Sequence, residues 1–280
     1  MTERERALRG IDATVPSVAR VYDYLLGGKD NFAVDRQVAE MILEISPDAP
    51  ATGRANREFL QRVVRYLVGE AGVRQFIDLG SGLPTQGNVH QIAQEVAPAA
   101  RVVYVDNDPI VLTHGRALLA EDGITTIVQG DIREPEALLN HAEVRQLIDF
   151  NQPVGLLLFA ILHHLNDHEN PRGIAARLLA ELPAGSYIAI SHFHNPGAAL
   201  PAVAEQVAAG EKLFNERLGT GRWRTREEIL AYFGGLEPIE PGLVPLLQWR
   251  PSPDAAPHVD TAAELAPLHY AFLGGVARKP

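Results

Sequence analysis

The sequence predicts an α/β protein with a doubly wound, mostly parallel sheet of seven strands, an antiparallel C-terminal strand and a helical N-terminal segment. Two later candidate strands, near 243–249 and 268–276, flank the proline-rich stretch PSPDAAPH, which we expect to be a loop. Between helical stretches lie five apolar runs: RQFIDLG, ARVVYVDND, TTIVQGD, VGLLLFAIL and GSYIAIS. Nearly continuous apolar runs are typical of strands buried on both faces, and their alternation with helices favours a parallel sheet.

The N-terminal part has helical patterns. Ser17 is a candidate cap for a helix through Leu26, which Gly27 and Gly28 interrupt, and a second helix is expected over 35–45. The stretch PDAPATG is predicted to be a loop. From 54 to 68 the apolar residues fall on one helical face: Phe59, Leu60, Val63, Val64, Leu67 and Val68.

The later part of the chain shows further helix signals. We expect helices over 197–234, one of them begun by a capping box between Thr225 and Glu228. No linker separates independent domains. We therefore expect a single domain over 1–280, divided into an N-terminal helical segment at 1–52 and a ligand-binding core at 53–280.

Composition narrows the possible functions. The chain has 280 residues, a net charge of −10 and no cysteine, which disfavours nucleic-acid partners and excludes disulfides, thiolate nucleophiles and Cys-ligated zinc. The first residues, MTERERALRG, lack the apolar run of a signal peptide, and no apolar stretch reaches about 18 residues. We expect a soluble cytoplasmic protein that does not enter a membrane; the oligomeric state is left open.

Three strand ends carry residues suited to an adenosine-containing ligand. Gly80 and Gly82 allow a tight turn after the first strand, where amides from about Gln86 onward would favour negative charge. Asp106 follows at close to the usual spacing of about 20 residues for an acid that binds a ribose. Asp108 is better explained as the cap of a helix that begins at Pro109.

The third strand end leaves two interpretations open. Asp131 could accept a hydrogen bond from an adenine amine, with the amide of Ile132 donating to the ring. Asp131 could equally be a cap before Glu134 and Pro135.

Two residues distinguish S-adenosylmethionine from a nicotinamide dinucleotide. Thr85 stands where the dinucleotide motif has its third glycine. Asp78 precedes the glycine turn, where a carboxylate would repel a pyrophosphate but attract the ammonium group of a methionine moiety. The residues therefore favour S-adenosylmethionine.

These motifs resemble those of class I S-adenosylmethionine-dependent methyltransferases, which have a Rossmann-like fold. DLGSG, VDND and GDI are similar to the first three motifs of that class. VYDYLLGGKDNFAVDR, ANREFLQRVVRYL, FIDLGSGLPTQGNVH and LEPIEPGLV resemble, over nearly the whole chain, the bacterial S-adenosyl methyltransferase group, also called domain of unknown function 574. Pro84 departs from the broad class, where many members carry glycine.

The resemblance implies a set of cofactor-binding residues. Near the methionine end it places Asp78, Gly80, Ser81 and Gly82; at the ribose, Asp106 and Asn107; at the adenine, Asp131 and Ile132; and after the fourth strand, Ala160. It also implies that the N-terminal segment is a lid, in which Gly28 lets the chain reverse and Tyr22, Lys29 and Asn31 reach the ligand.

Other interpretations of the lid residues stay open. The glycines fit an ordinary helix–turn–helix with Gly27 as C-cap, and Arg20 and Asp23 fit surface pairing. If the 54–68 helix packs antiparallel to the first strand, Asn56 and Arg57 approach the site, and Arg57 could pair with the methionine carboxylate or be a solvated arginine.

Four histidines follow the fourth and fifth strands: His163, His164, His192 and His194. We predict His163 as a general base; pocket walls or a metal site are alternatives, although no H-x-x-x-H spacing supports metal. Methyl transfer can also proceed by positioning alone, without a base. Trp223, Phe214 and Tyr232 could line an apolar substrate pocket or belong to the core.

The predicted function is methyl transfer from S-adenosylmethionine to a small-molecule acceptor, with O-, N- and C-methylation all open. A non-catalytic S-adenosylmethionine-binding module and an NAD-dependent oxidoreductase are the alternatives. The acidic charge balance disfavours an RNA substrate.

Overall fold

The computed structural model describes residues 12–84, 87–118, 123–251 and 267–280. The charged first residues, Thr85 and Gln86 of the glycine-turn argument, and most of the proline-rich stretch lie outside the described residues.

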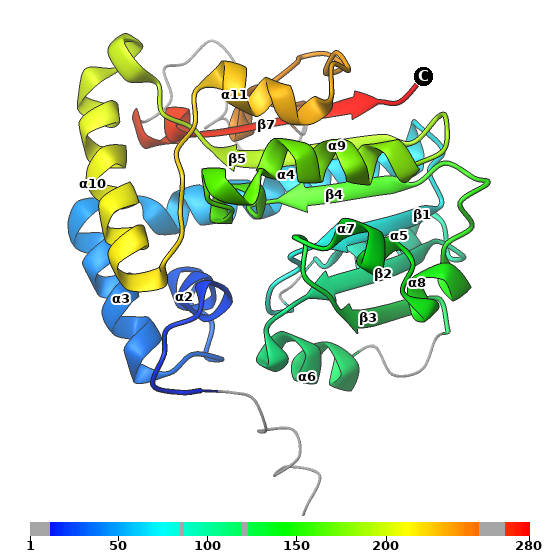
Figure 1. Ribbon diagram of the computed structural model, residues 1–280, viewed down its shortest axis with the longest axis horizontal. Helices are drawn as coiled ribbons and strands as arrows, with labels where there is room; N and C mark the ends of the chain where they lie inside the picture. Colours follow the sequence, from blue (N-terminus) through cyan, green and yellow to red (C-terminus); the bar gives the residue numbers. More distant parts are fainter. Residues whose placement is uncertain (1–11, 85–86, 119–122, 252–266) are drawn as a thin grey trace, which may run out of the picture.

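A seven-stranded sheet with the order β3-β2-β1-β4-β5-β7-β6 forms the centre of the fold (Figure 1). The first five strands run parallel, β7 pairs antiparallel with β5, and β6 pairs antiparallel with β7. This confirms the predicted mixed sheet. The strands are β1 (Gln75–Leu79), β2 (Arg101–Asp106), β3 (Thr125–Gln129), β4 (Gly155–Phe159), β5 (Tyr187–Phe193), β6 (Val244–Pro245) and β7 (Phe272–Arg278).

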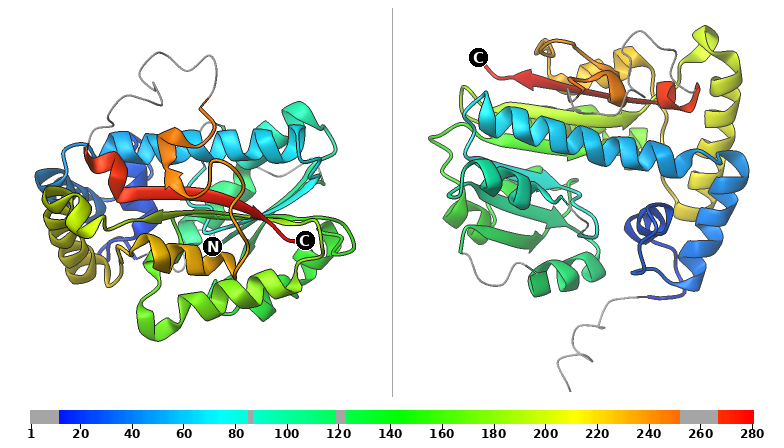
Figure 2. Two further views of the ribbon diagram at one scale, coloured as in Figure 1. Left: turned by 90° about the horizontal axis from the view of Figure 1, so that it is seen from above. Right: turned by 180° about the vertical axis from the view of Figure 1, so that it is seen from behind.

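Helices cover both faces of the sheet (Figure 2). One face carries α4 (Ala49–Gly69) and α5 (Val89–Val96), and the other carries α7 (Pro135–Leu139), α8 (Ala142–Leu147) and α9 (Pro171–Glu181). The remaining described α-helices are α2 (Val18–Leu25), α3 (Ala33–Ile45), α6 (Pro109–Leu118), α10 (Pro201–Leu218) and α11 (Arg226–Leu230). Of these, α2, α3 and α10 lie across the carboxyl ends of the strands (Figure 1).

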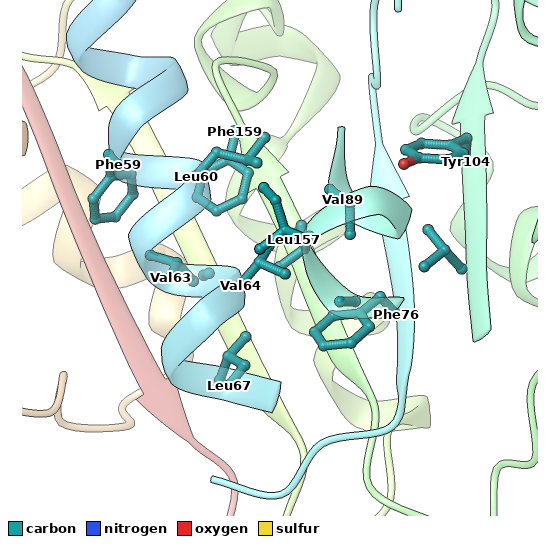
Figure 3. Packing of buried hydrophobic residues seen from close by; sticks show 14 of the residues in the cluster. Phe59, Leu60, Val63, Val64, Leu67, Phe76, Val89, Tyr104, Leu157 and Phe159 are labelled. Atoms are coloured by element: carbon teal, nitrogen blue, oxygen red, sulfur yellow. The ribbon is translucent and has the colours of Figure 1, made fainter. Parts of the chain in front are cut away.

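Successive side chains along each strand point to opposite faces of the sheet, so the hydrophobic core has two parts. Phe76 and Leu157 point to the α4 face and join the apolar stripe of that helix (Figure 3). Their neighbours Ile77 and Leu156 point to the α9 face. Both sets are fully buried, as expected when helices cover both faces of a parallel sheet.

One local prediction was wrong. The stretch PDAPATG is not a loop, because α4 begins at Ala49 and continues through the expected boundary between 52 and 53. Pro50 lies in the first turn of the helix, where its missing amide hydrogen costs nothing. Gly53 lets α2 pack closely, since an added Cβ would lie 3.2 Å from Leu26 Cδ2.

A buried ion pair holds α2 against α3. Arg20 Nε donates to Asp35 Oδ2 at 2.9 Å, and the two side chains are 4% and 0% exposed. Asp35 also accepts hydrogen bonds from the amides of Ser17 and Phe32. Sequence analysis left open that Arg20 pairs on the surface. Arg20 is instead the buried partner of Asp35, fifteen positions away.

We predict that Asp35→Ala lowers the free energy of unfolding by about 3–5 kcal/mol, because it leaves the Arg20 charge buried without a counter-charge. Urea unfolding followed by circular dichroism measures the change. Exposed Glu44 on the same helix provides the control, and Glu44→Ala should change stability by less than about 0.5 kcal/mol. An equal effect of both variants would contradict the importance of the ion pair.

Candidate active site

A cavity opens at the carboxyl ends of β1, β2, β4 and β5, beneath α2, α3 and α10. About 370 Å³ of it is open to water-sized molecules. Two parts can be distinguished by their lining. The part next to β1 and β2 carries the glycine turn and several carboxylates, whereas the part next to β5 and α10 is lined mainly by aromatic and aliphatic side chains.

The glycine turn after β1 is fixed to the end of β2. The amide of Gly80 donates to Val105 O at 2.8 Å, and the amide of Gly82 donates to Asp106 Oδ2 at 2.9 Å. Both glycines have positive φ, 71° and 66°. At Gly80 an added Cβ would also lie 2.6 Å from Ile161 Cδ1, so both conformation and space require glycine there.

Two buried carboxylates face the cavity behind this turn. Burial raises the pKa of Asp106, although the amides of Asp108 and Gly82 donate to its two oxygens and oppose the rise. Burial raises the pKa of Asp78 to about 7; the Arg57 charge lowers this pKa and the Asp106 charge raises it. Asp78 therefore gains or loses its charge near neutral pH.

Beside these acids the cavity wall has unused hydrogen-bonding groups. Arg57 lies on the first half of α4 and donates through Nη2 to Gly87 O at 3.2 Å. Its Nε and the hydroxyl of Ser81 are buried and have no hydrogen-bond partner within the described part of the chain. Because buried polar groups are normally paired, these two atoms indicate a place for a polar ligand.

A chain of hydrogen bonds joins the end of β4 to the N-terminal helices. Ala160 has a φ of 53°, a conformation that costs a non-glycine residue about 1–2 kcal/mol. Its amide donates to Ser191 Oγ at 2.9 Å, and Ser191 in turn donates to Asn56 Oδ1 at 2.7 Å. Asn56 Nδ2 donates to the hydroxyl of Tyr22 (3.3 Å), which donates to Gly53 O (3.0 Å).

The four histidines have different surroundings. His163 and His164 line the cavity, whereas His192 and His194 do not. His192 donates from Nδ1 to Phe193 O and accepts at Nε2 from Arg224, so both of its nitrogens are used. Burial lowers the pKa of His192 to about 3.

His163 is fully buried and accepts the amide hydrogen of Phe193 at Nδ1, 3.2 Å away. Burial first, and the neighbouring imidazoles next, lower its pKa well below the ordinary value. Because Nδ1 is the acceptor, the neutral ring carries its hydrogen on Nε2. Such a ring donates at Nε2 and does not remove a proton there, so the geometry argues against the predicted general base.

Most predicted cofactor residues lie on the cavity wall: Tyr22, Arg57, Asp78, Gly80, Ser81, Gly82, Asp106, Asn107, Ile132 and Ala160. Gly28, Asn31 and Asp131 are not among the lining residues. Asn31 donates to Asp23 Oδ2 (2.8 Å), and an added Cβ on Gly28 would overlap the Asp23 carboxylate. The geometry gives Gly28 and Asn31 a role within the turn, and their part in binding a cofactor stays a prediction.

Asp131 binds Arg133 instead of facing the cavity, and its side chain is 38% exposed. It also accepts the amide of Arg133, which gives the turn after β3 its shape. Gly130 and Ile132 on either side do line the cavity.

Sequence analysis missed several residues of the site. Ser17 directly precedes α2 as predicted, but its hydroxyl donates to Asp108 Oδ2 (2.5 Å) and does not cap the helix. Arg224 is buried and donates to Leu165 O and to Asp167, which fixes the turn after β4. Phe193 and Phe272 complete the aromatic lining. No local pattern marks these residues, because each acts on a distant part of the chain.

Within the described ranges, no three His, Asp or Glu side chains are grouped so that they could hold a metal ion. Nor is any described helix both long enough and apolar enough to span a bilayer.

Comparison with known proteins gives the family. Residues 4–280 match the family described as S-adenosyl methyltransferase. The chain belongs to this family. It is 44% identical to a protein from Thermobifida fusca YX whose crystal structure is described as that of a candidate methyltransferase, with a TM-score of 0.88 and 97% of each chain covered.

Two further solved structures extend the comparison. A member of the family called domain of unknown function 574 from Streptomyces avermitilis MA-4680 is 40% identical over 96% of this chain and 99% of its own, with a TM-score of 0.87. An O-methyltransferase family protein from Burkholderia thailandensis is 13% identical, with a TM-score of 0.51, over 98% of this chain and 66% of its own, and shows the fold alone. A search of curated proteins found no match.

Membership of the S-adenosyl methyltransferase family agrees with the sheet. The order β3-β2-β1-β4-β5-β7-β6, with β7 antiparallel, is that of class I methyltransferases. The resemblance identified from the motifs is thereby confirmed, and the family is one of S-adenosylmethionine-dependent enzymes.

The raised pKa of Asp78 predicts a pH dependence of stability. In the unfolded chain Asp78 ionises near 3.8, and in the folded protein near 7. Between these values the folded state holds the extra proton, so Asp78 makes the protein less stable as pH rises. We predict that the unfolding free energy of wild type, relative to Asp78→Asn, falls by about 2–3 kcal/mol from pH 5 to pH 8.

Urea titrations at several pH values measure this difference. Glu95→Gln on α5, which removes an exposed carboxylate, serves as the control for which we expect no such trend. A constant difference between wild type and Asp78→Asn would contradict the raised pKa.

Proposed function

We propose that this member of the family binds S-adenosylmethionine in the β1–β2 part of the cavity and transfers its methyl group to a small molecule held in the β5–α10 part. One observation carries the proposal. Among the described residues, the buried Arg57 Nε and Ser81 Oγ have no hydrogen-bond partner, and they lie beside the buried carboxylate of Asp78. An α-amino acid group, with one carboxylate and one ammonium, matches this combination of a cation, a hydroxyl and an acid.

Two further predicted residues, Asp106 and Ile132, fit the nucleoside part of the same ligand. A backbone amide donates to each oxygen of Asp106, and the lone pairs that remain can accept hydrogen bonds from ribose hydroxyls. Ile132 and Gly130 offer a wall for the adenine after β3. A pyrophosphate fits this place poorly, because Asp78 and Asp106 would repel its charge.

When bound, S-adenosylmethionine supplies an electrophilic methyl group on a positively charged sulfur. The protein then contributes by positioning the two reactants in the cavity and by excluding water from it. The hydrogen bonds from Asn56 to Tyr22 and from Ser17 to Asp108 hold α2 over the cavity. The apolar β5–α10 part of the cavity supports catalysis over a non-catalytic binding module, because a module that only senses the cofactor needs no second compartment.

We predict that the purified protein binds S-adenosylmethionine and S-adenosylhomocysteine in calorimetric titrations and does not bind NAD. Asp106→Ala should weaken binding of both ligands at least tenfold, since it removes the acceptor for the ribose and an anchor of the glycine turn. Glu136→Ala, on the exposed surface of α7, is the control and should leave affinity unchanged. Binding of NAD alone would overturn the proposal.

The affinity for S-adenosylhomocysteine should also depend on pH. Its ammonium group favours the ionised form of Asp78, which in the free protein is mostly protonated at pH 6 because its pKa is about 7. Affinity should therefore rise about five- to tenfold from pH 6 to pH 7.5. Asp78→Asn should bind more weakly and lose this dependence; an equally steep pH profile in that variant would place the titrating group elsewhere.

A further inference from the structure

The β5–α10 part of the cavity has a distinct chemical character. We call it the acceptor region and define it by His163, His164, Phe193, Phe214, Trp223 and Phe272, all of which line the cavity.

Aromatic rings dominate the acceptor region. Phe193 is stacked on His163, with centroids 3.6 Å apart, and on Trp223, with centroids 4.2 Å apart. Phe214 meets Trp223 edge to face at 5.4 Å. Phe272 in turn contacts Phe193 at 5.1 Å. Aromatic rings prefer such stacked and edge-to-face neighbours, so a wall of this kind favours an aromatic ligand over an aliphatic one.

The acceptor region also lacks opposite charges for an ionic ligand. The carboxylates among the described lining residues, Asp78, Asp106 and Asp108, lie on or directly after β1 and β2, and the lining arginines, Arg57 and Arg133, lie on α4 and after β3. Much of the remaining wall here is aliphatic, from Leu25, Ile42, Ile45, Leu213 and Leu218. The hydroxyls of Ser46 and Thr220 also line it, and each is hydrogen-bonded within the protein. An ammonium or carboxylate placed in this region would be desolvated without a counter-charge, which is costly.

Two imidazole nitrogens of the acceptor region differ from its other buried polar atoms in having no partner among the described residues. His163 Nε2 and His164 Nδ1 are buried and have no hydrogen-bond partner among the residues that the structure describes. The two rings are neighbours, with centroids 4.5 Å apart. Burial lowers the pKa of His164 to about 4, so both rings are neutral at pH 7.

The two nitrogens differ in what they can do. His163 carries its hydrogen on Nε2 because Nδ1 accepts from Phe193, so its Nε2 can only donate. His164 Nδ1 can accept when the hydrogen of that ring is on Nε2. A hydroxyl group, which accepts one hydrogen bond and donates another, satisfies both nitrogens at once.

We propose that the methyl acceptor is an uncharged aromatic hydroxyl compound whose ring packs in the acceptor region and whose hydroxyl binds His163 Nε2 and His164 Nδ1. This inference rests on the proposed function. His164 Nδ1 takes the proton that the hydroxyl oxygen loses as it accepts the methyl group, whose former bonding electrons stay with the donor sulfur. His163 is a hydrogen-bond donor that orients the oxygen.

Calorimetric titration of the full-length protein with 2-naphthol, with and without S-adenosylhomocysteine, tests the proposal. Three matched probes each change one property: decahydro-2-naphthol is saturated, naphthalene lacks the hydroxyl, and 2-naphthoate is charged. We expect 2-naphthol to bind at least tenfold more tightly than each of them. No binding of 2-naphthol, or equal binding of any matched probe, would overturn the proposal.

Variants then locate the binding site. Trp223→Leu and His164→Leu should each weaken 2-naphthol binding at least fivefold while the affinity for S-adenosylhomocysteine stays within twofold. His168→Leu, which removes an exposed histidine four positions away, is the matched control and should change neither affinity. Undiminished 2-naphthol binding in both cavity variants would contradict the assigned region.

The same titrations separate the two proposals. Binding of S-adenosylhomocysteine without 2-naphthol in any condition overturns the acceptor class and leaves the proposed function standing. Binding of 2-naphthol by a protein that binds no S-adenosylhomocysteine supports the aromatic hydroxyl site and overturns the cofactor assignment.

Discussion

The shape of the cavity depends on the hydrogen bonds of one buried side chain, that of Asn56. It lies on α4, is 4% exposed, and bonds to Ser191 on β5 and to Tyr22 on α2. Through Ser191 it also supports the left-handed backbone of Ala160 after β4. A buried amide that lost one of these partners would cost about 1–3 kcal/mol, so the N-terminal helices and the strand ends are held in one arrangement.

The hydrogen bonds of Asn56 stabilise the fold, whereas the buried acids beside the glycine turn lower its stability when they are charged. Burial raises the pKa values of Asp78 and Asp106, which means that their charged forms are unfavourable in the folded protein. The fold tolerates them because backbone amides donate to both oxygens of Asp106 and because Arg57 is near Asp78. Perturbed groups of this kind, gathered in a cavity, are what a binding site for a charged ligand requires.

The sheet and the turns after its strands could be predicted because they are encoded locally. Continuous apolar runs marked β1 to β5, and Gly80, Gly82 and Asp106 follow their strands at recognisable positions. Contacts between distant segments could not be predicted. The burial of Arg20 depends on Asp35, and the roles of His163 and His192 differ only because Phe193 and Arg224 occupy different ring nitrogens.

Helix α2 links the two parts of the cavity. Ser17, just before the helix, binds Asp108 after β2, whereas Leu25 at its end lines the cavity beside Ile42 and Phe214. A displacement of α2 would therefore alter the nucleoside side and the apolar side together. Because residues of α2 and its N-terminal flank line both parts of the cavity, the position of this helix couples the shape of the β1–β2 part to that of the acceptor region.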